Sequence, residues 1–106
     1  MWKIDKGSLS GTTTAVYGNA LDWKVEEIKE KTILLKNTAS SNSLKYRLFA
    51  YAVPDGTGSE EISEVTLAAG QIAKILLVKQ WARLVILVID GSGHASYQID
   101  YIGQGA

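Results

Sequence analysis

The amino-acid sequence predicts an all-β protein, an antiparallel β-sandwich of about seven or eight short strands that is immunoglobulin-like or jelly-roll-like. Two observations predict this class. Apolar residues alternate with polar ones, or form short apolar runs, in segments of strand length. Clusters of Gly, Asn, Asp and Ser separate these segments at short intervals, which favours antiparallel pairing because parallel strands need long crossovers.

The clearest strands lie between residues 31 and 102. They are expected over residues 31–36, 44–53, 61–67, 71–78, 83–89 and 94–102. Pro54 ends the second of them, because proline has no N–H to donate to a sheet. Residues 83–89 are apolar on both faces, which predicts a central strand. Within residues 71–78, one face carries Ala73, Ile75 and Leu77, and the other carries Ile72, Lys74, Leu76 and Val78. Residues 103–106 are expected to fray.

Residues 21–30 admit two interpretations. Leu21, Val25 and Ile28 recur at helical spacing, whereas every second residue from Trp23 onward alternates as in a strand. Periodicity alone does not separate the two. We favour a strand, because the segments that follow are all strand-like.

The N-terminal segment differs from the rest of the chain in composition. Residues 1–18 are rich in Gly, Ser and Thr, whereas residues 19–106 are expected to form a single β-sandwich domain. The first segment is therefore expected to be an N-terminal arm or an edge segment. Because it contains too little apolar surface to fold alone, we expect residues 15–18 to pair with a sheet edge and residues 1–10 to order mainly against a partner.

Charge balance and the absence of cysteine narrow the function classes. The 106 residues carry 11 basic and 11 acidic side chains, so the basic excess typical of nucleic-acid-binding proteins is missing. Without cysteine there is no disulfide, thiolate metal site or cysteine nucleophile. The longest apolar run, residues 84–89, is far shorter than a membrane-spanning helix, and no signal-peptide pattern is present. We therefore expect neither nucleic acid nor a membrane as partner.

His94, the only histidine, is the candidate for acid–base chemistry. Asp90, Ser92, Ser96 and Asp100 lie close to it in sequence, so a catalytic triad can be drawn. A triad needs a histidine held between a nucleophile and a carboxylate, usually from distant segments. A histidine beside a glycine-rich hairpin is instead expected to face water. We therefore expect no catalytic residue and no enzymatic activity.

Asp55, Thr57, Ser59 and Glu61 place oxygen-bearing side chains at alternate positions of a glycine-rich loop. Calcium loops share this spacing, since hard cations prefer oxygen ligands. Thr66 stands where the bidentate glutamate of such a loop is needed. We therefore expect an exposed hairpin loop here, with neither a metal nor a cofactor.

Large side chains outside the clearest strands are the candidate interface residues: Trp2, Ile4, Tyr17, Trp23 and Trp81. Trp and Tyr are enriched at the hot spots of protein interfaces, because they bury much area and carry a polar end. Trp2 and Ile4 would anchor the N-terminal arm. The alternative is a carbohydrate-binding module, in which exposed tryptophans stack on sugar rings.

The segments TILLKNT (residues 32–38), LKYR (44–47), LAAG (67–70) and WARLVI (81–86) resemble those of small phage virion proteins. Those proteins are β-sandwich subunits that decorate or cement capsids, or serve as other minor structural parts. The resemblance extends over residues 31–102. It implies a non-enzymatic structural role in a virion. The partners would be copies of the chain itself, as a trimer, and a major capsid protein.

Overall fold

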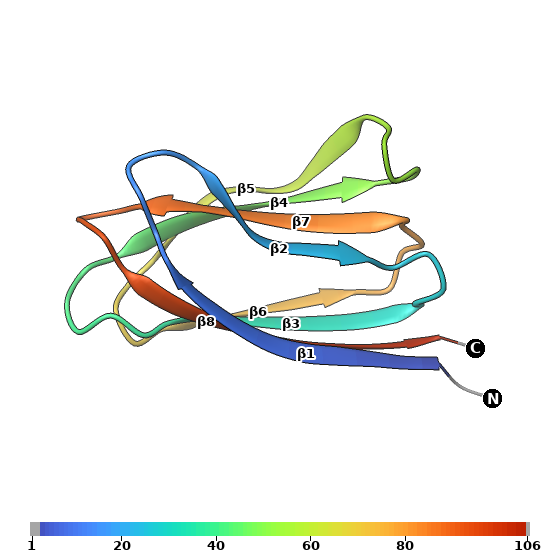
Figure 1. Ribbon diagram of the computed structural model, residues 1–106, viewed down its shortest axis with the longest axis horizontal. Helices are drawn as coiled ribbons and strands as arrows, with labels where there is room; N and C mark the ends of the chain where they lie inside the picture. Colours follow the sequence, from blue (N-terminus) through green and yellow to red (C-terminus); the bar gives the residue numbers. More distant parts are fainter. Residues whose placement is uncertain (1–2, 106) are drawn as a thin grey trace.

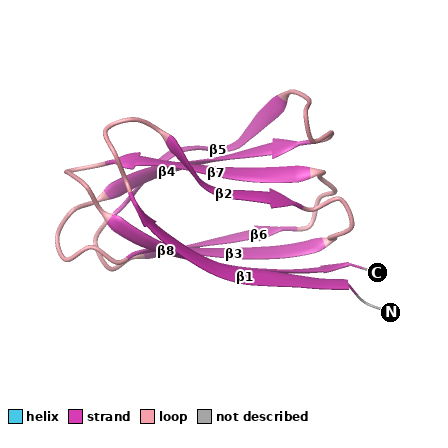
Figure 2. Ribbon diagram, in the orientation of Figure 1, coloured by secondary structure: helices cyan, strands magenta, loops and turns pink. Residues whose placement is uncertain are grey.

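The computed structural model describes residues 3–105, and every regular element within them is a β-strand (Figure 2). The strands are β1 (Lys3–Thr12), β2 (Gly18–Lys24), β3 (Glu30–Asn37), β4 (Leu44–Tyr51), β5 (Gly58–Leu67), β6 (Ile72–Leu77), β7 (Arg83–Asp90) and β8 (Ser96–Gly105). Sheet A has the order β1-β8-β3-β6 and sheet B the order β2-β7-β4-β5, both antiparallel. Figure 1 shows sheet B stacked above sheet A. The predicted all-β sandwich is confirmed. Across the described residues, no helix long and apolar enough to cross a membrane is found.

The order of the strands identifies the sandwich as a jelly roll. Paired strands are nested along the chain: β1 pairs with β8, β2 with β7, β3 with β6 and β4 with β5. Nested pairs arise when one long antiparallel ribbon folds over on itself, which produces two Greek keys. Of the two sandwich types that the sequence predicted, the structure has the jelly-roll type.

The ambiguous segment after Ala20 is a strand followed by a turn. β2 ends at Lys24, so the favoured interpretation is confirmed up to that residue. Beyond it, the N–H of Ile28 donates to the carbonyl of Val25 at 3.0 Å, and both side chains are buried. A turn brings residues three positions apart close together. The helix-like spacing in the sequence therefore belongs to a turn.

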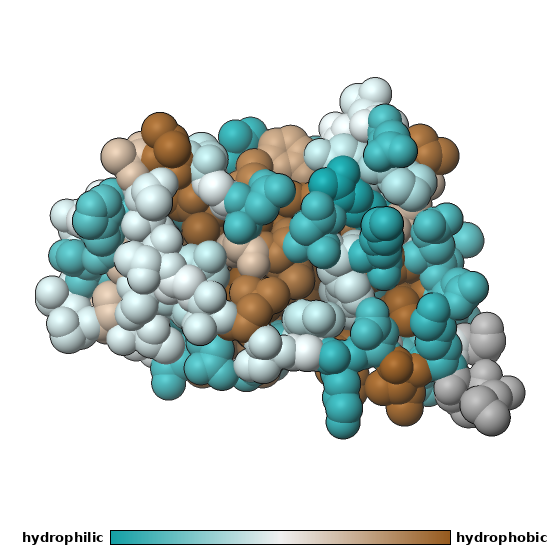
Figure 3. All heavy atoms as spheres, viewed as in Figure 1, coloured by the Kyte–Doolittle hydropathy of each residue, from teal (hydrophilic) through white to brown (hydrophobic). Residues whose placement is uncertain are grey.

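The inward-facing side chains of both sheets form one apolar core. Its fully buried members are Val25, Ile33, Leu35, Leu44, Leu48, Ala50, Leu84, Ile86 and Ile99. β7 lies between β2 and β4, as its two apolar faces predicted. In the space-filling view, apolar atoms fill the region between the two layers, and hydrophilic residues gather towards the right-hand end (Figure 3).

β1 is part of the sandwich, in contrast to the prediction that residues 1–10 order mainly against a partner. From Lys3 to its last residue it pairs with β8 of the same chain. Gly7 and Gly11 leave room on its inner face for tyrosine rings. A Cβ atom on Gly7 would lie 2.5 Å from the hydroxyl oxygen of Tyr101. The rings of β8 therefore supply the apolar cover that β1 lacks.

Residues 15–17 lie in the connection between β1 and β2, whereas we expected them to pair with a sheet edge. The hydroxyl of Thr14 donates to the carbonyl of Val16 at 2.9 Å, and the Val16 side chain is exposed. Local side-chain bonds of this kind compete with sheet pairing. β2 therefore begins only at Gly18.

The C-terminal glycines belong to β8 and are not the frayed end that we expected. β8 continues to Gly105, which pairs with Lys3. A Cβ atom on Gly105 would lie 1.8 Å from the carbonyl oxygen of Glu27, so this strand passes closely under the β2–β3 turn. Close backbone approach of this kind requires glycine. Ala106 lies outside the described residues.

Lys31 is a charged residue in the core, which its sequence context did not reveal. It is 2% exposed. Its Nζ donates to the carbonyl oxygens of Ile28 and Lys29 at 3.0 Å and of Lys79 at 2.9 Å. Burial lowers the pKa of the Lys31 ammonium. The three bonds tie the β2–β3 turn to the link between β6 and β7.

Candidate assembly surface

The outer face of sheet A presents apolar side chains that no other part of the described chain covers. Residues of a strand alternate between two faces, so this face carries Ile4 of β1, Ile102 of β8 and Leu76 of β6. They are 60%, 47% and 64% exposed, respectively. Lys6, Ile102, Thr32 and Leu76 lie in one row across all four strands of the sheet.

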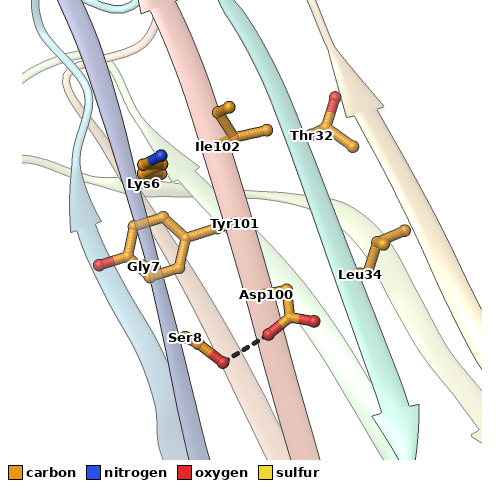
Figure 4. Close-up of a pocket in the computed structure, with 8 residues that line it drawn as sticks. All are labelled: Lys6, Gly7, Ser8, Thr32, Leu34, Asp100, Tyr101 and Ile102. Carbon is orange, nitrogen blue, oxygen red and sulfur yellow. Dashed lines mark hydrogen bonds between the residues drawn. The ribbon is translucent and has the colours of Figure 1, made fainter.

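A shallow depression of about 460 Å³ lies on this face (Figure 4). Its lining residues are Lys6, Gly7, Ser8, Thr32, Leu34, Asp100, Tyr101 and Ile102. The Ser8 hydroxyl donates to the Asp100 carboxylate, and hydrogen bonds from Ser8 and Gln98 hold the pKa of Asp100 below its usual value. Since these polar groups already have partners, the aliphatic side chains of Leu34 and Ile102 are free to contact a partner. The depression suits an apolar side chain of another protein.

The apolar surface continues to the edge of sheet A. Ile72 and Leu76 of β6 are 56% and 64% exposed, and Val78, just after the strand, is 71% exposed. Lys74 is the one charged side chain of β6. Exposed aliphatic groups therefore extend from β8 across the sheet to an edge strand.

The outer face of sheet B is covered by its own side chains. Arg47 pairs with Glu60, and its guanidinium carbon lies 4.9 Å from the centre of the Phe49 ring. Arg83 likewise lies over a tyrosine ring and donates to an aspartate. Beneath this layer Val85 is only 4% exposed. The two faces differ because charged and aromatic side chains close sheet B and leave sheet A open.

The predicted interface residues lie in different parts of the molecule. Ile4 lies on the open face of sheet A. Tyr17, in the β1–β2 connection, donates to Glu64, and burial together with this bond raises the pKa of Tyr17 to about 12. Trp81 is half-buried, and its Nε1 has no hydrogen-bond partner within residues 3–105. Trp2 lies outside the described residues.

Trp23 is a core residue, and we withdraw it from the predicted interface. It is 4% exposed, and its ring centre lies 4.8 Å from that of Tyr101. Gly103 makes room for it, since a Cβ atom there would lie 2.9 Å from the indole. The Trp23 Nε1 donates to Asp5 at 2.8 Å. A ring packed in this way cannot stack on a sugar, so the carbohydrate-binding alternative loses a platform residue.

His94 belongs to a polar cluster whose order does not suit a catalytic triad. Its Nδ1 lies 2.9 Å from Asp90, and the Thr13 hydroxyl donates to the same carboxylate at 2.6 Å. In a triad the imidazole stands between the hydroxyl and the carboxylate. Here the Ser92 hydroxyl accepts the N–H of Ser43, the Ser96 hydroxyl accepts from Thr38, and within residues 3–105 neither is hydrogen-bonded to His94. The bonds from Thr13 and His94 lower the pKa of Asp90. The cluster ties the β7–β8 turn to the end of β1.

The segment compared with calcium loops is largely the start of a strand. β5 begins at Gly58, so Ser59 and Glu61 belong to the sheet, where the Ser59 hydroxyl donates to Glu61 at 2.7 Å. Among residues 3–105, no three His, Asp or Glu side chains lie close enough together to hold a metal ion. Two of its four oxygen-bearing side chains therefore bond to each other within the strand.

No protein-family model matches this chain, and no curated protein sequence matches it. Solved structures share its fold. One from the Bacillus endospore appendages, which form disulfide-linked pili, has a TM-score of 0.70 at 12% identity, over 99% of this chain and 88% of that one. The SPBc2 prophage-derived protein YomS has a TM-score of 0.54 at 12% identity, over 97% and 96%. A chain of infectious bursal disease virus, Gx strain, has a TM-score of 0.55 at 10% identity, over 97% and 32%.

At these identities the likeness shows the fold alone. The neighbours include a prophage-derived protein and a virus protein, so the predicted resemblance to phage and viral β-sandwich proteins is confirmed at the level of the fold. A mitogen derived from Yersinia pseudotuberculosis shares the fold too, with a TM-score of 0.59 at 14% identity. One fold serves many roles, so function has to be argued from the surface of this chain.

Proposed function

We propose that this chain is a structural subunit that works by assembling with other protein subunits, as a decoration or cement protein does on a capsid. The open apolar face of sheet A carries the proposal. Aliphatic side chains left bare over several neighbouring strands mark protein interfaces. The proposed partners are further copies of the chain and a major capsid protein, which would place the protein in the virion.

The polar clusters of the chain favour a structural role over an enzymatic one. The carboxylate of Asp90 is held between Thr13 and His94, and that of Asp100 is held by Ser8. Each cluster joins two strands or a strand and a turn. These groups therefore stabilise the sandwich.

Two further observations support assembly. Solved structures with this fold come from pili and from a virus, which are assemblies of many subunits. The net charge of zero means that copies of the chain do not repel one another at neutral pH. Self-association is therefore opposed by little beyond the entropy of association.

Light scattering on the purified protein, with two matched lysine variants, tests the proposal. Leu76→Lys changes a side chain that is 64% exposed on the apolar face. The control, Val16→Lys, changes one that is 70% exposed in the β1–β2 connection. Losing the burial of one leucine costs about 1.5–3 kcal/mol, so we expect Leu76→Lys to weaken self-association roughly 10- to 100-fold.

The control variant should associate as the wild type does, and both variants should keep the wild-type thermal midpoint when monomeric. A wild-type protein that stays monomeric at high concentration would overturn the proposal. If the two lysine substitutions weakened self-association equally, the apolar face of sheet A would not be the assembly surface.

A further inference from the structure

The four edge strands differ in how well their free backbone groups are protected. In sheet B, β2 has a bulge between Asn19 and Leu21, while β5 has register shifts against β4 and three glutamates. In sheet A, β1 turns the carboxylate of Asp5 inward to accept the N–H of Trp23. Bulges, charges and inward-pointing charged residues keep edge strands from pairing with other chains. Three of the four edges therefore carry such a device.

The remaining edge, β6, is the least protected: it has no bulge, no inward-pointing charge and one outward charge. It pairs with β3 in unbroken register, and Lys74 is its one charged residue. Ile72 and Leu76 project from it into solvent, followed by Val78. A regular edge strand with exposed aliphatic side chains is a template for the addition of another strand.

We propose that β6 pairs antiparallel with β6 of a second copy, so that the two four-stranded sheets A become one continuous sheet. This inference rests on the assembly role proposed above, and it identifies the first contact between two copies of the chain. A second copy is the occupant because the strand is complementary to itself. A pairing centred on Ile75 sets Ile72 opposite Val78 of the second copy, and it sets Lys74 opposite Leu76 of that copy.

A register centred on Lys74 fits less well. Centring the pair on Lys74 would set two lysines directly opposite each other, and like charges in that position destabilise a sheet. On the inner face, Ala73 and Leu77 pack against the edge of the core and remain half-buried. The register centred on Ile75 sets these two residues opposite each other, so the core of one copy continues into the next.

The pairing also shapes the surface available to a lattice. Since the strands of a joined sheet share one outer face, the open apolar faces of the two copies lie side by side. A two-fold contact of this kind closes after two copies. The contact therefore predicts a dimer as the first assembled species, in place of the expected trimer.

A charge test distinguishes this register from face-to-face stacking. Leu76→Lys would set two lysine pairs across the contact, and we expect at least about tenfold weaker association. Leu76→Glu would set a glutamate opposite Lys74 twice, so we expect it to weaken association clearly less than Leu76→Lys does. Stacking of apolar faces predicts instead that both substitutions weaken association alike.

Cysteine trapping tests the register directly, because the chain has no cysteine of its own. Residues directly opposite lie about 4.5–5.5 Å apart, whereas diagonal neighbours lie about 7–8 Å apart, beyond disulfide reach. A mixture of Lys74→Cys and Leu76→Cys proteins should therefore form a mixed disulfide dimer, which mass spectrometry identifies. Each variant alone should cross-link poorly, and so should the control Glu61→Cys on β5.

The outcomes separate the inference from the proposed function. A mixed Lys74→Cys and Leu76→Cys dimer, together with a clearly smaller effect of Leu76→Glu than of Leu76→Lys, supports β6 pairing. The pairing is overturned if the wild type forms oligomers but the cysteine variants form no mixed disulfide dimer. It is also overturned if a Lys74→Cys homodimer is the main product. Both outcomes leave the assembly role standing. A strictly monomeric wild type overturns both.

Discussion

Replacing Gly11 with alanine should destabilise the sandwich by an amount that follows from its geometry. A Cβ atom at this position of β1 would lie 2.5 Å from the hydroxyl oxygen of Tyr97 and 2.8 Å from its Cζ. Tyr97 is 7% exposed, so its ring has little room to move. Adding a methyl group to a packed core costs about 1–3 kcal/mol. At about 4–8 °C per kcal/mol, the thermal midpoint should fall by roughly 4–24 °C.

Gly18→Ala is the matched control for this experiment. A Cβ atom on Gly18, in β2, would meet no atom within 4 Å. Alanine there restricts the unfolded chain and should stabilise the protein by about 0.4–1 kcal/mol. Calorimetry at several protein concentrations separates the folding effect from assembly. Equal midpoints for Gly11→Ala and Gly18→Ala would refute the packing of β1 beneath the tyrosines of β8, and β1 would then behave as a free arm.

Two further variants test the polar ties of the fold. Lys31→Met leaves three carbonyls without their donor and should cost about 1–3 kcal/mol in urea unfolding. Burial lowers the pKa of Lys31, so the wild type, unlike the variant, should gain stability as pH rises from that lowered pKa towards 10.5. The hydrogen bond from Thr13 lowers the pKa of Asp90. The stability that the ionised Asp90 carboxylate contributes is therefore present above about pH 4, and it is lost as the pH falls through the pKa of Asp90 in the folded protein. Asp90→Asn should therefore lower the thermal midpoint at neutral pH and flatten its decline in acid. An unchanged acid profile in this variant would count against the cluster with His94.

The two faces of β6 show where the alternation of residues in the sequence no longer predicts which face is buried. Alternation separated Ile72 and Leu76 from Ala73 and Ile75, yet both faces are apolar. The structure turns the face with Leu76 and Lys74 outward and buries Ile75 of the other face in the core. Lys74, on the outward face, was the local signal that could have identified it.

The candidate site was harder to predict than the strands, because the exposure of a side chain depends on which residues of distant strands pack against it. Trp23 was expected at an interface, but Gly103 and Tyr101 on a distant strand enclose it. Ile4 was predicted to anchor an arm, and it lies on the open face of sheet A instead. The apolar face itself is assembled from β1, β8, β3 and β6, which are far apart in the chain.

By itself, the sequence determined the all-β class, the approximate positions of most strands and the absence of cysteine chemistry. Those properties are local, since alternation along a strand and turn residues act within a few positions. Tertiary structure decided the jelly-roll pairing, the inclusion of β1, and the burial of Trp23 and Lys31. It decided them because strand pairing and burial depend on side chains that meet only after distant segments come together. The tyrosine rings of β8 fill the space that the glycines of β1 leave, and carbonyls from two separate connections hold the ammonium of Lys31.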